Sequence, residues 1–468
     1  MNKAASLSRM VAGGLFVLQA MFCSLPTPAG TSATSTDQPP GRADSPQGSV
    51  YYVAMDGDDG NPGTFDLPWR TIQYAADTLQ AGDTVYIRAG QYNERVIPQN
   101  SGSPGSYITY AAYENEEVTI HGDEVTVPDW GGLFEVSQKS YIVVSGLRVL
   151  NSQNAGILVD TASNIIIENN YTENTFSSGI GVWSSDHVTV RGNEVVLACN
   201  DGPQEDITIA GTDIFEVADN HVHQGAAGTN GGEGIDVKDG SSNGSVHGNH
   251  VHDLPRVGIY IDAWDKHTYN ILVYQNMVHD IDAYGIVLAS ESGGLLENVR
   301  VYNNISYHNE YMGLGISSCC DDLSPTHPML NLDIINNTFF GSGLGAWGGG
   351  ITVDNPDIQD VTLRNNIVSQ NLSFQIVVEP LVPMGELTVD HNLIDGFRGY
   401  EGEIRGSDYV EGDPRFMGAL AGNFNLQAGS PAIDVGSPLE APGDDMNGTT
   451  RPQDGDGSGT AEFDMGAY

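Results

Sequence analysis

Apolar and polar residues alternate in short runs along most of the chain, and many runs end at a residue pair whose second member is asparagine. These second members are Asn170, Asn193, Asn220, Asn249, Asn276, Asn304, Asn337, Asn366 and Asn392. They are separated by 23, 27, 29, 27, 28, 33, 29 and 26 residues. Alternation with a period of two predicts short β-strands, and the regular return of one phrase predicts a repeat.

A second phrase, glycine followed by isoleucine, lies between most of the asparagine pairs and opens another alternating run. It begins at Gly156, Gly179, Gly234, Gly258, Gly285 and Gly350. Each period therefore holds at least two short strands joined by turns of Gly, Asn and Asp, with little room for a helix. Such a unit cannot bury its apolar face alone, so we expect the units to stack.

The sequence thus predicts an all-β chain that forms a single-stranded right-handed parallel β-helix. A Greek-key sandwich of short strands would explain the alternation but not nine returns of one phrase. We expect inward Ile, Val and Leu side chains to stack in columns. An asparagine at the strand end suits a turn with left-handed backbone geometry and a hydrogen bond to the next coil.

The ends of the chain predict distinct segments. Residues 1–33 have the pattern of an export signal, with Lys3 and Arg9 before an apolar run and cleavage near Ala29 or Ala33. Residues 34–48 read as a flexible leader, 49–400 as the β-helix and 401–468 as a C-terminal closing segment. Helical spacing from Thr71 to Leu79 predicts an N-terminal capping helix, because the first coil otherwise exposes an unpaired edge.

Charge narrows the choice of partner. The chain carries 61 acidic and 18 basic residues, a formal net charge of −43. Such a surface repels nucleic acid and anionic membranes, so we expect no nucleic-acid partner. No segment after the export signal reaches about 18 uninterrupted apolar residues, so we expect no membrane insertion. An anionic polysaccharide would also be repelled unless cations or local basic residues intervene.

Two groups of motifs carry a family resemblance. The opening segments Gly57–Thr64, Thr71–Gln73 and Gly82–Thr84 resemble the start of secreted carbohydrate-active β-helix proteins, including family-nine pectate lyases. The segments Gly412–Phe416 and Asp464–Tyr468 resemble the closing part of the same proteins. This resemblance implies a secreted, extracellular protein with a polysaccharide partner, and is more specific for architecture than for substrate.

Alignment of the glycine-isoleucine phrases predicts one site. Outward side chains lie two residues apart along a strand, so equivalent positions form columns across coils. Over about three coils these columns hold charged and aromatic residues, whereas the equivalent positions of other coils hold no such cluster. We expect one outer wall to gather Glu205, Glu233, Asp236, Lys238, Tyr260 and Asp262. Trp183 lies one coil before, and Trp264, Asp265, Lys266 and His267 follow directly, as candidate substrate-binding residues or, for His267, a proton donor.

Lys238 carries a second resemblance. The segment Glu233–Lys238 is similar to the acid-Gly-x-x-x-Lys segment that holds the catalytic lysine of family-nine pectate lyases. Its Glu-to-Lys interval also resembles chondroitinase B and related alginate lyases. These resemblances imply β-elimination on a uronate polymer, with Lys238 as base and Tyr260 or His267 as proton donor. Arg256 is a displaced candidate for the arginine of the chondroitinase-like family.

Physical chemistry adds a requirement for a cation. A lysine has a reference pKa of about 10.4, and the neighbouring carboxylates of Asp236 and Asp262 favour its charged form further. Lys238 therefore acts as a base only if something offsets those anions. We expect Ca²⁺ to do so while also binding the substrate carboxylate. The candidate metal ligands are Glu205, Asp206 and Glu233, with Asp236 as an alternative to Asp206.

Three other interpretations remain open. A glycoside hydrolase would pair Glu205 with Glu233, or Asp236 with Asp262, and Lys238 would only orient a carboxylate. A non-catalytic adhesin would bind glycan without needing Lys238. In the third interpretation, the same residues form a solvated acidic face with one lysine for charge balance, and their role is only structural.

Two further groups of residues invite a metal interpretation. His221, His223, His247, His250, His252 and His279 fall on the asparagine-turn side of successive coils. A polar ladder is the favoured interpretation over a zinc site. The Asp-rich turns at 444–448 and 454–457 could bind calcium, but solvated turns are favoured because neither has a full loop of ligand spacing.

Overall fold

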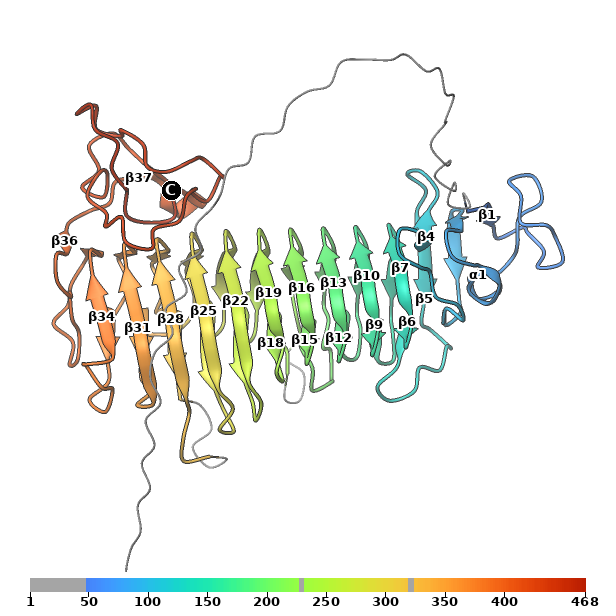
Figure 1. Ribbon diagram of the computed structural model, residues 1–468, viewed down its shortest axis with the longest axis horizontal. Helices are drawn as coiled ribbons and strands as arrows, with labels where there is room; N and C mark the ends of the chain where they lie inside the picture. The colour runs from blue at the N-terminus through green and yellow to red at the C-terminus, as the bar shows by residue number, and fades with distance from the viewer. Residues whose placement is uncertain (1–47, 227–230, 319–323) are drawn as a thin grey trace, which may run out of the picture. The chain divides into compact units, whose positions relative to one another are not determined.

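The computed structural model describes residues 48–226, 231–318 and 324–468. The predicted export signal and the leader up to residue 47 lie outside the described residues. From residue 48 onward the chain winds into coils whose strands form three long parallel sheets (Figure 1). Each complete coil adds one strand to each sheet, so a coil has three strands where the sequence predicted at least two. The predicted all-β right-handed parallel β-helix is confirmed.

Sheet A has 13 strands. They are β1 Val50–Val53, β2 Thr84–Ile87, β4 Ile108–Ala112, β7 Ser140–Ser145, β10 Ser163–Glu168, β13 Asp186–Arg191, β16 Asp213–Ala218, β19 Ser242–His247, β22 Thr268–Tyr274, β25 Leu296–Tyr302, β28 Met329–Ile335, β31 Ile358–Arg364 and β34 Leu387–Asp390.

Sheet B also has 13 strands and follows sheet A in each coil. They are β3 Gly90–Tyr92, β5 Val118–His121, β8 Arg148–Leu150, β11 Tyr171–Glu173, β14 Glu194–Val196, β17 His221–His223, β20 His250–Leu254, β23 Met277–Ile281, β26 Ile305–Tyr307, β29 Thr338–Phe340, β32 Ile367–Ser369, β35 Leu393–Asp395 and β36 Val410–Glu411.

Sheet C has 10 strands, and the glycine-isoleucine phrases open many of them. They are β6 Gly132–Ser137, β9 Ala155–Asp160, β12 Ile180–Trp183, β15 Ile207–Ala210, β18 Ile235–Lys238, β21 Ile259–Ala263, β24 Ile286–Ser290, β27 Met312–Ser317, β30 Gly349–Val353 and β33 Phe374–Val378.

Inward isoleucines stack from coil to coil as predicted. Ile207, Ile235, Ile259 and Ile286 are register partners on successive strands of sheet C, and all are fully buried. The glycine before each isoleucine has a steric cause. A Cβ at Gly234 would lie 2.5 Å from the carbonyl oxygen of Gly258 on the next coil, so no larger residue fits this corner without moving the backbone.

The asparagine of each pair forms a buried ladder between sheets A and B. The side chain of Asn249, for example, donates to Val217 O at 2.9 Å and to Asn276 Oδ1 at 2.9 Å, and its oxygen accepts from Asn220 N at 3.0 Å. The residue before the asparagine takes the left-handed backbone conformation, as Gly248 does with φ 64°. The two predicted roles of asparagine are therefore divided between the two members of the pair.

A helix covers the N-terminal end of the β-helix, and the C-terminal segment packs on the outer side of sheet B. Helix α1, Ile72–Thr78, begins at the capping residue Thr71 and buries Ile72, Ala75 and Ala76 in the main core, which confirms the predicted helix. After the last coil the chain forms the antiparallel strands β37 Phe416–Gly418 and β38 Asn423–Leu426, joined through the 3₁₀ turn Ala419–Ala421.

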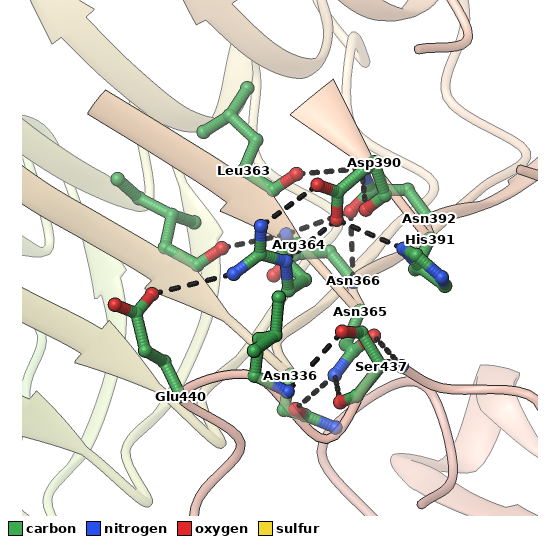
Figure 2. A network of polar contacts seen from close by, with 12 residues as sticks. Asn336, Leu363, Arg364, Asn365, Asn366, Asp390, His391, Asn392, Ser437 and Glu440 are labelled. Carbon is green, nitrogen blue, oxygen red and sulfur yellow. Dashed lines mark hydrogen bonds and ion pairs between the residues drawn. The ribbon is translucent and has the colours of Figure 1, made fainter. Parts of the chain in front are cut away.

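The C-terminal segment is fastened to the coils by polar contacts (Figure 2). Asn365 and Ser437 exchange two hydrogen bonds of 2.8 Å. Arg364 pairs with Asp390 of the next coil at 2.6 Å and with Glu440 of the C-terminal segment at 3.4 Å. Apolar contacts add to this, since Phe424 packs on Ile305 and Tyr307 of β26. The segment therefore covers side chains of the coils that would otherwise face solvent.

Candidate active site

A cavity of about 540 Å³ lies over the middle of sheet C. Strands β15, β18 and β21 and the segments around them supply most of its walls. The lining residues are Trp130, Trp183, Pro203, Gln204, Glu205, Glu233, Asp236, Lys238, Asp239, Tyr260, Asp262, Trp264 and Glu291. All six members of the predicted outer wall are among them.

Strand register brings these side chains together. Asp236 of β18 is the register partner of Tyr260 on β21, and Lys238 is the partner of Ala210 on β15. Continued by one residue, the same register sets Lys238 beside Asp262. Because register is fixed by the stacked isoleucines, the columns drawn from the sequence are the columns of the structure.

Among the described residues that line the cavity, Lys238 is the one with a basic side chain. Its ammonium group lies between two carboxylates. Its Nζ lies 2.5 Å from Glu205 Oε1 and 3.3 Å from Asp236 Oδ2. Burial by itself would lower the pKa of Lys238, but Asp236 and Glu205 outweigh it and raise the pKa above the ordinary value. In this arrangement Lys238 is a charged hydrogen-bond donor.

Several carboxyl groups of the cavity hold protons more tightly than usual. Burial, together with the nearby charge of Glu205, raises the pKa of Glu233 to about 7. Burial also raises the pKa of Asp236 and of Asp262 well above the ordinary value, with neighbouring acids adding to the effect at Asp262 and Lys238 opposing it. A cavity with six carboxyl groups and one ammonium group can thus both donate and accept protons near neutral pH.

Tyr260 has a hydrogen-bond partner that the alignment did not reveal. Its hydroxyl donates to Glu291 Oε1, and burial and Glu291 together raise the pKa of Tyr260 well above its ordinary value. The hydroxyl therefore keeps its proton at neutral pH and points into the cavity.

Three tryptophans give the cavity apolar walls. Trp130 and Trp183 meet edge to face with ring centroids 6.0 Å apart, and Trp264 is part of the same lining. Trp130 is 70% exposed, which is unusual for so large an apolar ring. Exposed aromatic faces beside polar groups suit the apolar faces of sugar rings.

Some predicted residues lie outside this cavity. Asp265 and Lys266 are exposed and are not among its lining residues. His267 pairs with Glu297 of sheet A at 2.7 Å and does not line the cavity either. Arg256 lies 3.7 Å from Glu233 and is not part of the lining. These residues come after strand ends or in turns, where the alternation of a strand no longer determines which way a side chain points.

The predicted calcium ligands are not assembled into one group in the described structure. Asp206 is fully buried and does not line the cavity, and the two oxygens of Glu205 are taken by Lys238 and by the hydroxyl of Thr208 at 2.8 Å. Among the described residues, no cavity trio brings its donor atoms within 4.8 Å of one another. A pre-assembled site at Glu205, Asp206 and Glu233 is therefore absent from the described structure.

The cavity still fits a hard cation by its donor chemistry. Asp236 Oδ1 and Asp262 Oδ1 are buried and have no hydrogen-bond partner among the described residues. Glu233 offers a third carboxyl group in the same lining. Both oxygens of Asp206 are likewise buried and without a hydrogen-bond partner among the described residues. Calcium prefers carboxylate oxygens and accepts irregular geometry, so Asp236, Asp262 and Glu233 join the predicted trio as side chains that could hold it.

Glu291 and Trp130 are among the lining residues that escaped the sequence analysis. Glu291 lies two residues beyond Ala289, the register partner of Asp262, so extending the column would have found it. Trp130 lies in the segment before β6 and carries no repeat signal. Its place depends on the path of an irregular loop, which periodicity cannot predict.

Five of the six histidines of the predicted ladder lie on sheet B, away from the cavity, and His247 ends β19 of sheet A. His221 and His250 are register partners, as are His223 and His252, and His252 and His279. The rings of His252 and His279 stack with centroids 5.0 Å apart. Burial, with other histidines nearby, lowers the pKa of His250 to about 4.

Comparisons with known proteins bear out the resemblance. Residues 51–246 match the family described as "Pel9A-like, right handed beta helix region", and residues 199–339 match "Right handed beta helix region". The predicted resemblance to family-nine pectate lyases and related β-helix proteins is confirmed. The Pel9A-like match includes Glu205, Glu233 and Lys238.

Two curated relatives share sequence with the chain. The uncharacterized protein YwoF of Bacillus subtilis (strain 168) is 28% identical over 447 residues, which cover 83% of this chain and 93% of YwoF. Pectate lyase PEL9 of Emericella nidulans is 31% identical over 158 residues, which cover 31% of this chain and 37% of PEL9.

Solved structures share the fold. XylC in complex with xylose has a TM-score of 0.56 at 14% identity, covering 90% of this chain and 98% of XylC. Pectate lyase Pel9A has a TM-score of 0.51 at 14% identity, covering 90% of this chain and 96% of Pel9A. The chain has the fold of carbohydrate-active β-helix enzymes. No helix among the described residues has both the length and the apolar character of a membrane span.

Proposed function

We propose that the chain is an exported enzyme that cleaves a uronate-containing polysaccharide by β-elimination in the cavity over sheet C. One observation carries this proposal. The amine of Lys238 lies among the carboxyl groups of that cavity, in the part of the chain that matches the Pel9A-like family. The partial sequence similarity to pectate lyase PEL9 supports the same reaction class.

The chain's own groups can be assigned roles in this reaction. The tryptophan walls hold sugar rings. Lys238 Nζ, once deprotonated, removes the proton from the carbon α to the uronate carboxylate. The electron pair left on that carbon forms the new C=C bond as the bond to the 4-linked oxygen breaks. Tyr260 gives its proton to this leaving oxygen, and Glu291 orients the hydroxyl.

The charge of Lys238 makes a cation part of the proposal. Glu205 and Asp236 hold the lysine proton firmly in this structure. Glu233, Asp236 and Asp262 are the residues that would hold calcium. When bound there, a calcium ion would neutralise the substrate carboxylate and weaken the negative field that retains the proton on Lys238.

A screen of substrates tests the reaction class. Purified protein is incubated with polygalacturonate, alginate, chondroitin and neutral xylan, each with added calcium or with excess chelator. We expect a uronate polymer to yield products that absorb in the ultraviolet through the new C=C bond, and chelation to abolish the product. Equal rates with and without chelator would contradict the calcium-assisted mechanism.

One observation favours a second candidate, a glycoside hydrolase. The pKa of Glu233 is raised to about 7, while Glu205, at the equivalent position one coil earlier, is ion-paired with Lys238. One protonated and one ionised carboxyl group on opposite sides of a glycosidic bond form the acid and base of such enzymes. The same screen separates the two, because a hydrolase produces reducing ends without ultraviolet absorbance.

A further inference from the structure

Two neighbouring coils of sheet B place a compact group of imidazoles on the outer face. One ring nitrogen from each of His221, His223 and His252 lies within 4.8 Å of the corresponding nitrogens of the other two. His221 and His223 are two residues apart on β17, and His252 is the register partner of His223 on β20. The strands therefore fix all three side chains, and no irregular loop is needed to assemble them.

The group combines one stacked pair of rings with one close contact between ring nitrogens. His223 and His252 stack with centroids 5.1 Å apart, while His221 Nε2 and His252 Nε2 lie 2.8 Å apart. Nδ1 of His252 pairs with Asp253 Oδ2 at 2.7 Å. A carboxylate on Nδ1 keeps the proton there and leaves the lone pair on Nε2, the arrangement found behind metal-bound histidines.

We propose that His221, His223 and His252 bind a divalent transition-metal ion such as zinc on the outer face of sheet B. Imidazole nitrogens suit zinc, copper and nickel, whereas calcium prefers oxygen. Glu194 lies beside the group, with Oε1 3.3 Å from His223 Nε2, and supplies negative charge. The three histidines are partly exposed, so an ion can enter from solvent.

The distances require only small movements. Zinc–nitrogen bonds are about 2.0–2.1 Å long, and in tetrahedral geometry two such nitrogens lie about 3.3 Å apart. The pair at 2.8 Å must open by about half an ångström, and the third nitrogen, which lies within 4.8 Å of the other two, must approach by at most about 1.5 Å. Rotation of side chains supplies shifts of this size without moving the strands. This site lies on a different sheet from the cavity, so it is independent of the proposed reaction.

Zinc binding to the full chain tests the proposal. The protein, expressed without a histidine tag and stripped with chelator, is titrated with zinc by calorimetry in excess calcium, which occupies acidic sites. The variants are His252→Gln, His221→Gln and Asp253→Asn. The control is His247→Gln, because His247 pairs with Glu216 and stacks on Tyr274 outside the group. Thermal melts without zinc verify that each variant is folded.

We expect one tight zinc ion per wild-type chain and per His247→Gln chain. His252→Gln and His221→Gln should weaken zinc binding at least about 100-fold, and Asp253→Asn about tenfold, in the range found for outer partners of metal-bound histidines. Cobalt added to the wild-type chain should give the visible absorption of a nitrogen-ligated ion. Wild-type protein without tight zinc binding, or the same affinity in His252→Gln and His221→Gln as in the control, would overturn the proposal.

Discussion

Ion pairs within the cavity determine the protonation state of Lys238. Lys238 is the basic group of the lining, and its contacts with Glu205 and Asp236 keep it protonated. Sequence reasoning reached the same conclusion from the density of carboxylates near Lys238. It could not show which carboxylate takes the lysine, because that depends on side-chain torsions and not on register.

Glu233 should make stability depend on pH. Its folded pKa of about 7 lies above the ordinary value of 4.5 for a glutamate, so the folded state binds the extra proton. This contribution to stability is fully present below about pH 4.5 and is lost as pH rises to about 7. The difference corresponds to about 3 kcal/mol in the free energy of unfolding.

The variant Glu233→Gln tests this effect, because glutamine does not ionise. We expect it to be more stable than the wild-type protein at pH 8 by up to about 3 kcal/mol, with the advantage vanishing near pH 4. Denaturant unfolding at both pH values gives the comparison. Asp265→Asn, an exposed site beyond the rim, is the matched control. An equal difference at both pH values would contradict the raised pKa.

Between elements, the asparagine ladder and the stacked isoleucines set the register on which the cavity depends. The sequence predicted the strands, the coils and the main columns of the site, since each coil repeats one phrase and neighbouring coils are also neighbours in sequence. It did not place Trp130 or the ends of the His267 and Arg256 side chains. These positions follow from turns whose length varies between coils, so periodicity holds no information about them.

Removal of one ladder asparagine should destabilise the β-helix. In Asn249→Ala the backbone N–H of Asn220 and the carbonyl of Val217 lose buried partners. A buried group left without a partner costs about 1–3 kcal/mol, so we expect a loss of about 3 kcal/mol in the free energy of unfolding.

The control for this change lies in the same region. Asn270 belongs to an exposed row of asparagines and has φ 58°, so Asn270→Gly removes its side chain without backbone strain. We expect a change below about 1 kcal/mol. Equal losses in Asn249→Ala and Asn270→Gly would mean that burial of the ladder contributes nothing.

For the molecule as a whole, a net charge of −43 opposes folding through self-repulsion. The Debye length falls from about 10 Å at 0.1 M salt to about 3 Å at 1 M. We therefore expect the melting temperature to rise between 0.05 and 1 M sodium chloride, and to rise equally in potassium chloride because the effect is screening. An unchanged melting temperature would mean that the acidic surface does not limit stability.

The C-terminal segment covers apolar side chains on the outer side of sheet B. It covers Ile305 and Tyr307 of β26 with Phe424, and Ile367 and Leu393 of later coils with Ala432 and Met465. The cavity lies on the separate sheet C, which this packing leaves open to substrate.

The most direct test of the central claim compares Lys238→Met with Lys266→Met, a nearby exposed lysine outside the cavity. Both variants are assayed on the polysaccharide that the wild-type protein cleaves, with melting curves to verify folding. If Lys238 removes the substrate proton, its loss should lower the rate of cleavage by about 10²–10⁴-fold, while Lys266→Met stays within about twofold of wild type. A folded Lys238→Met variant that cleaves as fast as Lys266→Met would contradict the account.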